Sequence, residues 1–91
     1  MLSQMRQAIR EQRYRISSHA NEEMSEDNLV MDDIENIILT GQAAQKFTHD
    51  PRGIRYEIAG KAIDGRRACV VCRFLSSNVL LIITVYALET Q

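Results

Sequence analysis

The 91-residue chain has no tryptophan, one proline and only two cysteines. Two cysteines are too few for a disulfide framework, and a structural zinc site needs a second pair of ligands. The apolar stretch at 79–88 is about half the roughly 20 residues that a membrane helix needs. The first twelve residues are polar and charged, unlike a signal peptide. We therefore expect a soluble cytoplasmic protein without a metal site, a cofactor or a membrane partner.

The two cysteines, Cys69 and Cys72, have the C-x-x-C spacing of redox and zinc motifs. They lie in a β-branched run that predicts a strand, where positions three apart point to opposite faces. Redox pairs of this spacing lie at the start of a helix instead. We expect both to be small buried or half-buried residues in a reducing compartment.

The formal net charge is only −1, but the charged residues are strongly segregated along the sequence. Residues 1–20 hold four arginines and one acid, 21–45 hold seven acids and no base, and 46–73 hold seven bases and three acids. A nearly neutral protein of this kind can still present one basic surface. Taken singly, each of these charges is better explained as solvated surface.

Helical periodicity is confined to the first 41 residues. A first helix is expected at about 4–12 with Ser3 as its cap, followed by an extended segment at 14–17. A second helix begins at a Ser18 cap and ends at Asp27-Asn28, where asparagine tolerates a left-handed backbone. The third is the clearest and spans 30–41, with two acids in its first turn and Gly41 as its stop.

After Gly41 the period changes to two. Strands are expected at 43–48, 54–63, 67–74 and 79–87, separated by turns at 49–53, 64–65 and 76–78. Helices followed by such a meander are typical of α+β proteins. The sequence thus predicts one domain over 1–91, with N-terminal helices on one face of an antiparallel four-stranded sheet.

Alternation along the strands separates a core face from an open face, because the helices can cover only one of them. The expected core set is Tyr56, Ile58, Ala68, Val70, Cys72, Phe74, Val79, Leu81, Ile83, Val85 and Ala87. The expected open face holds Arg55, Glu57, Arg67, Arg73, Thr84 and Tyr86 around Val71, Leu80 and Ile82. Arginine, tyrosine and exposed aliphatic residues together are typical of interfaces and binding clefts.

Such a face can bind or cleave a phosphodiester. Guanidinium groups bind phosphate and stabilise the charge of a transition state, a tyrosine or histidine can move the proton, and Thr84 can hydrogen-bond phosphate or sugar. Surface pairing across the strands explains the same residues equally well. His19, near a helix N-terminus, suits a base, but it can also pack at the sheet edge or pair with Glu23 one turn on.

The sequence resembles a bacterial family of small uncharacterised domains with an S-x-H-A motif and a terminal V-I-T-V-Y strand. The residues that carry the resemblance are Ser17-Ser18-His19-Ala20, Met24, Asp32-Asp33-Ile34, Gly41, Arg55-Tyr56, 68–73 and Ile83-Thr84-Val85-Tyr86. That family looks related to the RelE/ParE/BrnT-like toxins, which have N-terminal helices on an antiparallel sheet. Many of these are ribonucleases that act through the exposed sheet face.

The resemblance implies the toxin of a type II toxin–antitoxin pair, a metal-independent endoribonuclease that binds RNA and a small antitoxin. His19, Arg55, Arg73 and Tyr86 are the candidate catalytic residues, and Arg67 and Thr84 the candidate substrate-binding residues. The alternative is a module of the same fold without catalysis, whose open face binds another protein or forms a homodimer.

Overall fold

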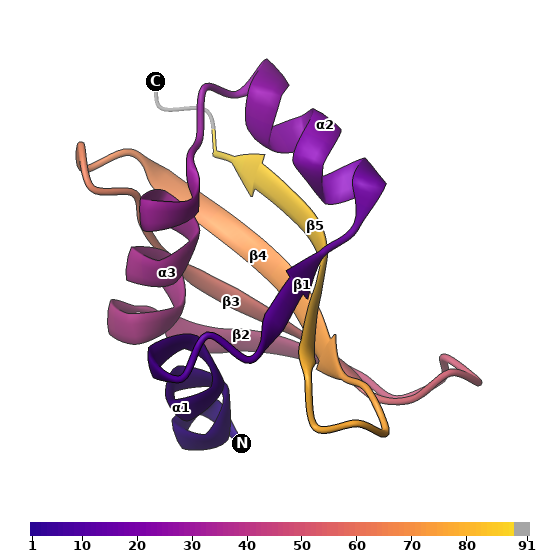
Figure 1. Cartoon of the computed structure of the whole chain (residues 1–91). Coiled ribbons are helices and arrows are strands. Elements are labelled where there is room, and N and C mark those ends of the chain that lie inside the picture. Colours follow the sequence, from indigo (N-terminus) through magenta and orange to yellow (C-terminus); the bar gives the residue numbers. More distant parts are fainter. Residues whose placement is uncertain (89–91) are drawn as a thin grey trace.

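Residues 1–88 form three helices and five strands (Figure 1). The computed structural model describes residues 1–88, so the last three residues of the domain expected over 1–91 lie outside the described part. The elements, in chain order, are α1 (Leu2–Arg10), β1 (Tyr14–Ile16), α2 (Ser18–Glu26), α3 (Met31–Thr40), β2 (Gln42–Phe47), β3 (Arg55–Lys61), β4 (Arg67–Phe74) and β5 (Leu80–Ala87). The α+β class expected from the sequence is confirmed.

The sheet is five-stranded and mixed, in the order β1-β5-β4-β3-β2. The prediction of four antiparallel strands is wrong in one respect, because β1 is a fifth strand that pairs in parallel with β5. The sequence correctly indicated an extended segment there. Three residues are too few for a periodic signal, however, and the partner strand lies at the other end of the chain.

The helix ends differ slightly from expectation. The Ser3 cap is wrong, because α1 begins at Leu2, two residues earlier than expected, and has no side-chain cap. The cap of α2 is Ser17 rather than Ser18: its hydroxyl oxygen lies 3.0 Å from the Ala20 nitrogen and accepts its N–H. The same hydroxyl donates to the Ile83 carbonyl at 2.9 Å, which joins the start of α2 to β5. The left-handed backbone predicted at Asn28 is present, with φ 54°.

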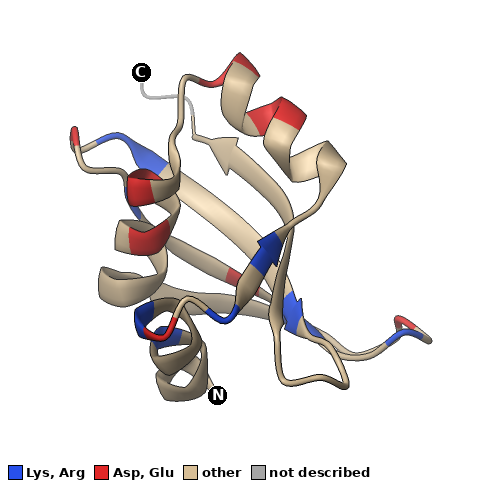
Figure 2. Cartoon of the chain, viewed as in Figure 1, with Lys and Arg blue, Asp and Glu red and all other residues tan. Residues whose placement is uncertain are grey.

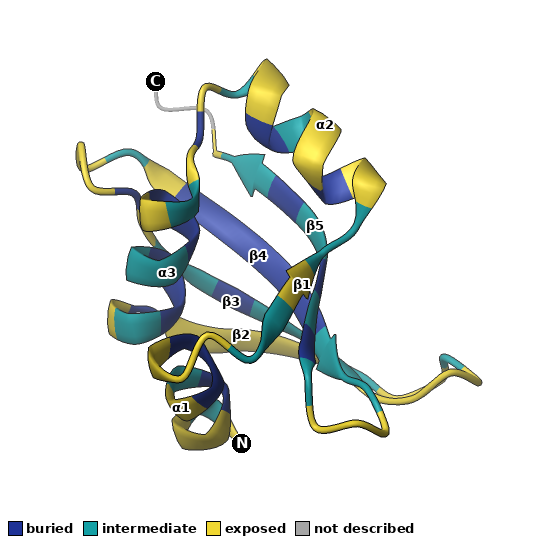
Figure 3. Cartoon of the chain, in the orientation of Figure 1, coloured by how far each residue is buried: buried dark blue, intermediate teal, exposed yellow. Residues whose placement is uncertain are grey.

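All three helices lie on one face of the sheet, and the core fills the space between (Figures 1 and 3). The largest fully buried side chains come from α1, α3 and three strands: Met5, Ile34, Ile37, Ile38, Ile58, Val70, Cys72, Leu80, Ile82 and Val85. Both cysteines are free and buried, as expected. Within residues 1–88, no helix has the length and apolar character needed to cross a membrane.

A β-bulge in β5 corrects the expected faces of that strand. Val71 pairs with Thr84, but the next residue of β4, Cys72, pairs with Ile82, so Ile83 is an extra residue. One extra residue reverses the alternation on its far side. Leu80 and Ile82 therefore lie in the core, and the placement of Val79, Leu81 and Ile83 there is wrong. Thr84 and Tyr86 lie beyond the bulge and keep the open-face position predicted for them.

Side chains of α2 complete the edge of β5 where β1 ends. Glu23 accepts the backbone N–H of Val85 and Asp27 accepts that of Ala87, each at 3.0 Å. The two acids are four residues apart, which is a rise of about 6 Å along a helix, and the two N–H groups are two residues apart, which is about 6.6 Å along a strand. The acceptors and donors therefore have matching spacings. The helix thereby protects this sheet edge, whereas β2 at the opposite edge is largely exposed.

Candidate functional site

Three arginines from three strands lie in one row across the open face. Tyr14 and Ile16 pack on the core, so Arg15 between them faces the other way. Its partner on β5 is Leu81, whose partner on β4 is Arg73. The row continues with Arg55 on β3, which pairs with Phe47 on β2. Figure 2 shows the resulting segregation: acids mark α2 and α3, bases mark β1 and the two ends of β4, and the loop between β2 and β3 carries both signs.

Asp50, in the β2–β3 loop, lies against this row, and only 4% of its side chain is exposed. Its Oδ2 is 3.2 Å from Nε of Arg55 and 3.8 Å from Nη1 of Arg73. Its Oδ1 accepts hydrogen bonds from the backbone N–H and the Nε of Arg52, at 2.9 and 3.2 Å. These hydrogen bonds, with the charges of Arg52 and Arg55, hold the pKa of the Asp50 carboxyl below its usual value.

Two atoms at the centre of this cluster are poorly satisfied. Oδ2 of Asp50 and Nε of Arg55 are both buried, and neither has a hydrogen-bond partner among the described residues. They attract each other by charge without the alignment of a hydrogen bond. The Phe47 ring, whose centroid is 5.2 Å from the Arg55 guanidinium, helps to shield the cluster from water. A buried polar atom without a partner costs about 1–3 kcal/mol, so this pair needs an explanation.

A second polar cluster lies beside the arginine row. The Tyr86 hydroxyl donates a hydrogen bond to Oε1 of Glu57, which is two residues from Arg55 on the same face of β3. This bond, together with burial, raises the pKa of Tyr86 above its usual value, so the phenol stays protonated at neutral pH. Cys69 is the direct partner of Tyr86 on β4, and burial raises the pKa of its thiol. Thr84 lies on the same face, opposite Val71.

Two residues expected in the site lie apart from the arginine row. Arg67 is at the opposite end of β4, roughly 20 Å from Arg73 at about 3.3 Å per residue. His19 is on α2, with 66% of its side chain exposed and its Nε2 3.2 Å from Oε1 of Glu23. This contact matches one of the alternatives to a catalytic base, namely pairing with Glu23 one turn on.

Sequence reasoning did not assign four of the residues in these clusters to the site: Arg15, Phe47, Asp50 and Glu57. Arg15 was within reach, because alternation with Tyr14 and Ile16 already predicts its direction. Glu57 was placed on the open face but given no role. Asp50 had no signal, because an aspartate beside a proline in a turn is ordinary surface chemistry. Its side chain is buried only because Arg73 of β4 lies beside Arg55 at the start of β3, and Arg73 is far from Asp50 in the sequence.

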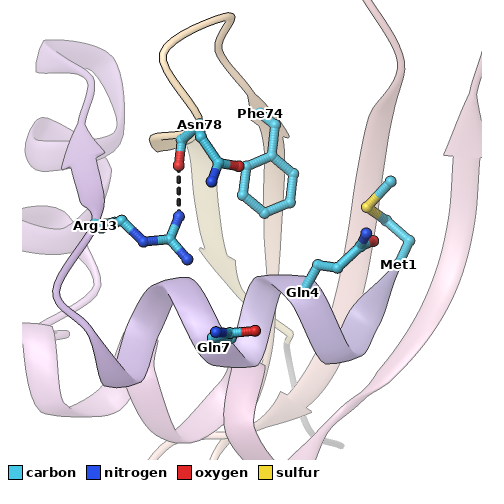
Figure 4. A pocket seen from close by; sticks show the side chains of 6 residues that line it. All are labelled: Met1, Gln4, Gln7, Arg13, Phe74 and Asn78. Carbon is cyan, nitrogen blue, oxygen red and sulfur yellow. Dashed lines mark hydrogen bonds between the residues drawn. The ribbon is translucent and has the colours of Figure 1, made fainter.

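The structure offers little for other kinds of site. No group of three or more His, Cys, Asp or Glu residues that could hold a metal ion occurs within residues 1–88. A cavity of about 380 Å³ lies between α1 and the β4–β5 loop, lined by Met1, Gln4, Gln7, Arg13, Phe74 and Asn78 (Figure 4). Phe74 packs on the core, whereas Arg73 before it faces outward. The cavity is thus on the helix side of the sheet, away from the arginine row.

Comparison with known proteins places the chain in a family. Its sequence matches, over residues 16–87, the family described as "Domain of unknown function (DUF4258)". No curated protein and no solved structure gives a significant match. The matched range takes in all five strands except the first two residues of β1, together with α2, α3 and every residue of the two polar clusters but Arg15. Because the match covers most of the chain, this protein belongs to the DUF4258 family.

Proposed function

We propose that the open face of the sheet binds and cleaves RNA, and that the protein is the toxin of a type II toxin–antitoxin pair. The observation that supports this most is the convergence of Arg55 and Arg73 on one carboxylate, that of Asp50. Two guanidinium groups from neighbouring strands that already hold one oxyanion can hold another. The shape and charge of a phosphodiester suit this position.

The reaction proposed is attack of a ribose 2′-hydroxyl on the adjacent phosphorus. The O2′–P bond forms, the P–O5′ bond breaks, and the negative charge gathers on the phosphoryl oxygens, where Arg55 and Arg73 stabilise it. Glu57 takes the proton from the 2′-hydroxyl, and the Tyr86 hydroxyl fixes the position of this carboxylate. The Tyr86 hydroxyl returns a proton to the leaving oxygen and regains one from Glu57, to which it is hydrogen-bonded, and Thr84 orients the ribose. Cleavage of this kind uses side chains alone.

The antitoxin is proposed as a small protein that covers the same face. An acidic segment of it would compete with RNA for the arginine row, because carboxylates and phosphates bind the same guanidinium groups. The resemblance to the RelE/ParE/BrnT-like toxins supports this part of the proposal.

Growth arrest and RNA breakdown test the proposal together. Expression of the wild-type protein in a bacterial host is expected to stop growth, and the purified protein to degrade RNA. Arg73→Ala should abolish both effects. Arg67→Ala removes the same charge from the far end of the same strand and face, and should leave both largely intact. If wild-type protein is harmless and leaves RNA uncut, the ribonuclease proposal fails.

Three further variants identify the groups that move protons. Glu57→Gln and Tyr86→Phe should slow RNA cleavage strongly while leaving RNA binding nearly unchanged, because neither removes a guanidinium group. His19→Ala should leave RNA cleavage nearly unchanged, because this histidine lies on α2, apart from the arginine row. A normal cleavage rate in Glu57→Gln would exclude Glu57 as the base.

A binding module without catalysis is the second candidate function, and one observation favours it. Leu81 and Ile83 lie half-buried on the open face of β5, and Leu81 stands between Arg15 and Arg73 in the arginine row. Apolar residues on an uncovered sheet face suit a protein partner or a second copy of the chain. RNA binding should weaken steeply as salt rises, whereas association through an apolar surface should hardly respond.

A further inference from the structure

We propose that Asp50 occupies the phosphate site between Arg55 and Arg73 when no RNA is bound, and that a substrate phosphate must displace it. The β2–β3 loop (48–54) then acts as a gate that holds the site closed with its own carboxylate. This inference rests on the proposed function for the identity of the ligand, a phosphodiester.

The first support comes from two turns with the same local chemistry. In Asp50-Pro51-Arg52 and in Asp64-Gly65-Arg66, the aspartate accepts the backbone N–H of the arginine two residues on, at 2.9 and 3.0 Å. It also accepts the Nε of that arginine, at 3.2 and 2.8 Å. The Asp64 side chain is nevertheless 56% exposed, and that of Asp50 only 4%. The turn itself therefore does not require the burial of Asp50.

The second support is the poor fit of Asp50 to the groups that surround it. Its Oδ1 is committed to the turn, which leaves a single oxygen, Oδ2, for both Arg55 and Arg73. That oxygen and Nε of Arg55 remain without a hydrogen bond. A phosphate group is not tied to the turn and brings two free oxygens. It can accept hydrogen bonds from both guanidinium groups in good geometry, so the exchange replaces a misaligned contact with aligned ones.

The third support is the weak attachment of the loop to the rest of the protein. The β2–β3 hairpin extends away from the body of the molecule (Figure 1). Within residues 1–88, the hydrogen bonds made by Asp50, Arg52 and Gly53 stay inside the loop. Gly53, with φ 127°, gives the chain a flexible joint just before β3. Moving Asp50 away from Arg55 and Arg73 therefore breaks two ion pairs and no hydrogen bond between these loop residues and the rest of the described chain.

A gate of this kind lowers the apparent affinity of the site by the fraction of molecules that are open. If the closed arrangement is favoured by roughly ten to one or more, removing the Asp50 charge raises the affinity by about that factor. Asp50→Asn is the suitable change, because the asparagine oxygen can still accept the Arg52 N–H and keep the turn. Asp50→Ser is a second variant that also retains a side-chain acceptor for that N–H.

The experiment measures binding of a ten-residue oligodeoxythymidylate, which has phosphates but no 2′-hydroxyl and so cannot be cut by the proposed reaction. Its dissociation constant is compared for the wild type, Asp50→Asn, Asp50→Ser and Asp64→Asn at one salt concentration. The two Asp50 variants should bind about tenfold more tightly. Asp64→Asn removes the same charge from the matching turn and should change binding by less than about twofold.

Adding Arg73→Ala to Asp50→Asn should cancel the gain, because the opened site then lacks one of its two guanidinium groups. The gate is overturned if Asp50→Asn and Asp50→Ser, shown by circular dichroism to be folded, bind no more tightly than Asp64→Asn. If the wild type cleaves RNA but Asp50→Asn binds the oligonucleotide no more tightly, the gate is wrong and the ribonuclease proposal stands. If Asp50→Asn binds more tightly but the protein never cleaves RNA, the ribonuclease proposal is wrong and the gate stands.

Discussion

In the two Asp-x-Arg turns, one at each end of β3, the aspartate accepts the backbone N–H and the Nε of the arginine two residues on, but the turns differ in how they contact the rest of the protein. In the β3–β4 turn, Arg66 reaches the backbone carbonyls of Asp27 and Asn28, at 2.6 and 2.9 Å. That arginine fastens the turn to the connection between α2 and α3. In the β2–β3 turn, Arg52 points into solvent and the aspartate is buried instead. The β3–β4 turn is thus anchored to the protein by its arginine, whereas the β2–β3 turn contacts the arginine row through its aspartate.

A second contact strengthens the docking of the β3–β4 turn. Asp33 of α3 accepts the backbone N–H of Ile63 at 3.0 Å and that of Val30 at 2.9 Å. Asp33 is 7% exposed as a whole residue, so it is a buried acid, as the side chain of Asp50 is. Both of its oxygens are satisfied, however, whereas one oxygen of Asp50 is not. The difference teaches that burial alone does not identify a functional acid. An unsatisfied oxygen among cations is the informative feature.

The largest effect is expected from Asp33→Ala, which should loosen the attachment of the β3–β4 turn to the helices. It leaves two backbone N–H groups without their acceptor, and we expect a loss of about 2–3 kcal/mol in the free energy of unfolding. Urea denaturation measures this loss. Asp32→Ala is the matched control, since Asp32 lies in the same helical turn but is exposed and should cost less than about 1 kcal/mol. Equal losses in the two variants would contradict the anchoring role.

The two turn arginines provide a smaller contrast. Arg66→Ala removes two hydrogen bonds to backbone carbonyls and should lower the free energy of unfolding by about 1–2 kcal/mol. Arg52→Ala should change it by less than about 0.5 kcal/mol, because 72% of that side chain is exposed. Thermal unfolding of the two variants side by side measures the difference. A similar loss in both would mean that the β2–β3 turn is also anchored through its arginine.

The smallest expected effect is on the titration of the two aspartates. Hydrogen bonds from Arg52 and Arg66 hold the pKa values of Asp50 and Asp64 below the ordinary value of 3.8. A lowered folded-state pKa means that each carboxylate contributes stability above the unfolded value, and that this is lost as pH falls below 3.8. Both should therefore stay charged at pH 4, which a carboxyl NMR titration measures.

The same titration in the presence of the oligodeoxythymidylate sharpens the comparison. The pKa of Asp50 should rise part of the way toward its ordinary value, because the carboxylate leaves Arg55 and gains a phosphate as a neighbour. The pKa of Asp64 should not move. A shift of equal size in both residues would point to a general effect of the added charge rather than to displacement.

Much of the fold was predictable because it depends on short-range patterns. Helical periodicity located α3, the apolar alternation of β4 gave its bounds, and Asn28 ended α2 as expected. The open-face positions of Arg55, Arg73, Thr84 and Tyr86 follow from the same alternation. The pairing of β1 was beyond reach because it joins three residues to a strand near the other end of the chain. The prediction of which sheet face Leu80–Ile83 occupy was wrong for a different reason. All four residues are apolar, so the sequence does not reveal the extra residue of the β-bulge.

The amino-acid sequence by itself determined the local geometry of both turns, since an aspartate two residues before an arginine can close the same hydrogen bonds wherever it occurs. Only the tertiary structure decided what each turn does. Asp50 meets Arg55 and Arg73 because two neighbouring strands present them on the face toward which its loop folds. Asp64 stays in solvent because Arg66 turns to the α2–α3 connection. Hydrogen bonds within a turn are local, but burial is set by segments far apart in the chain.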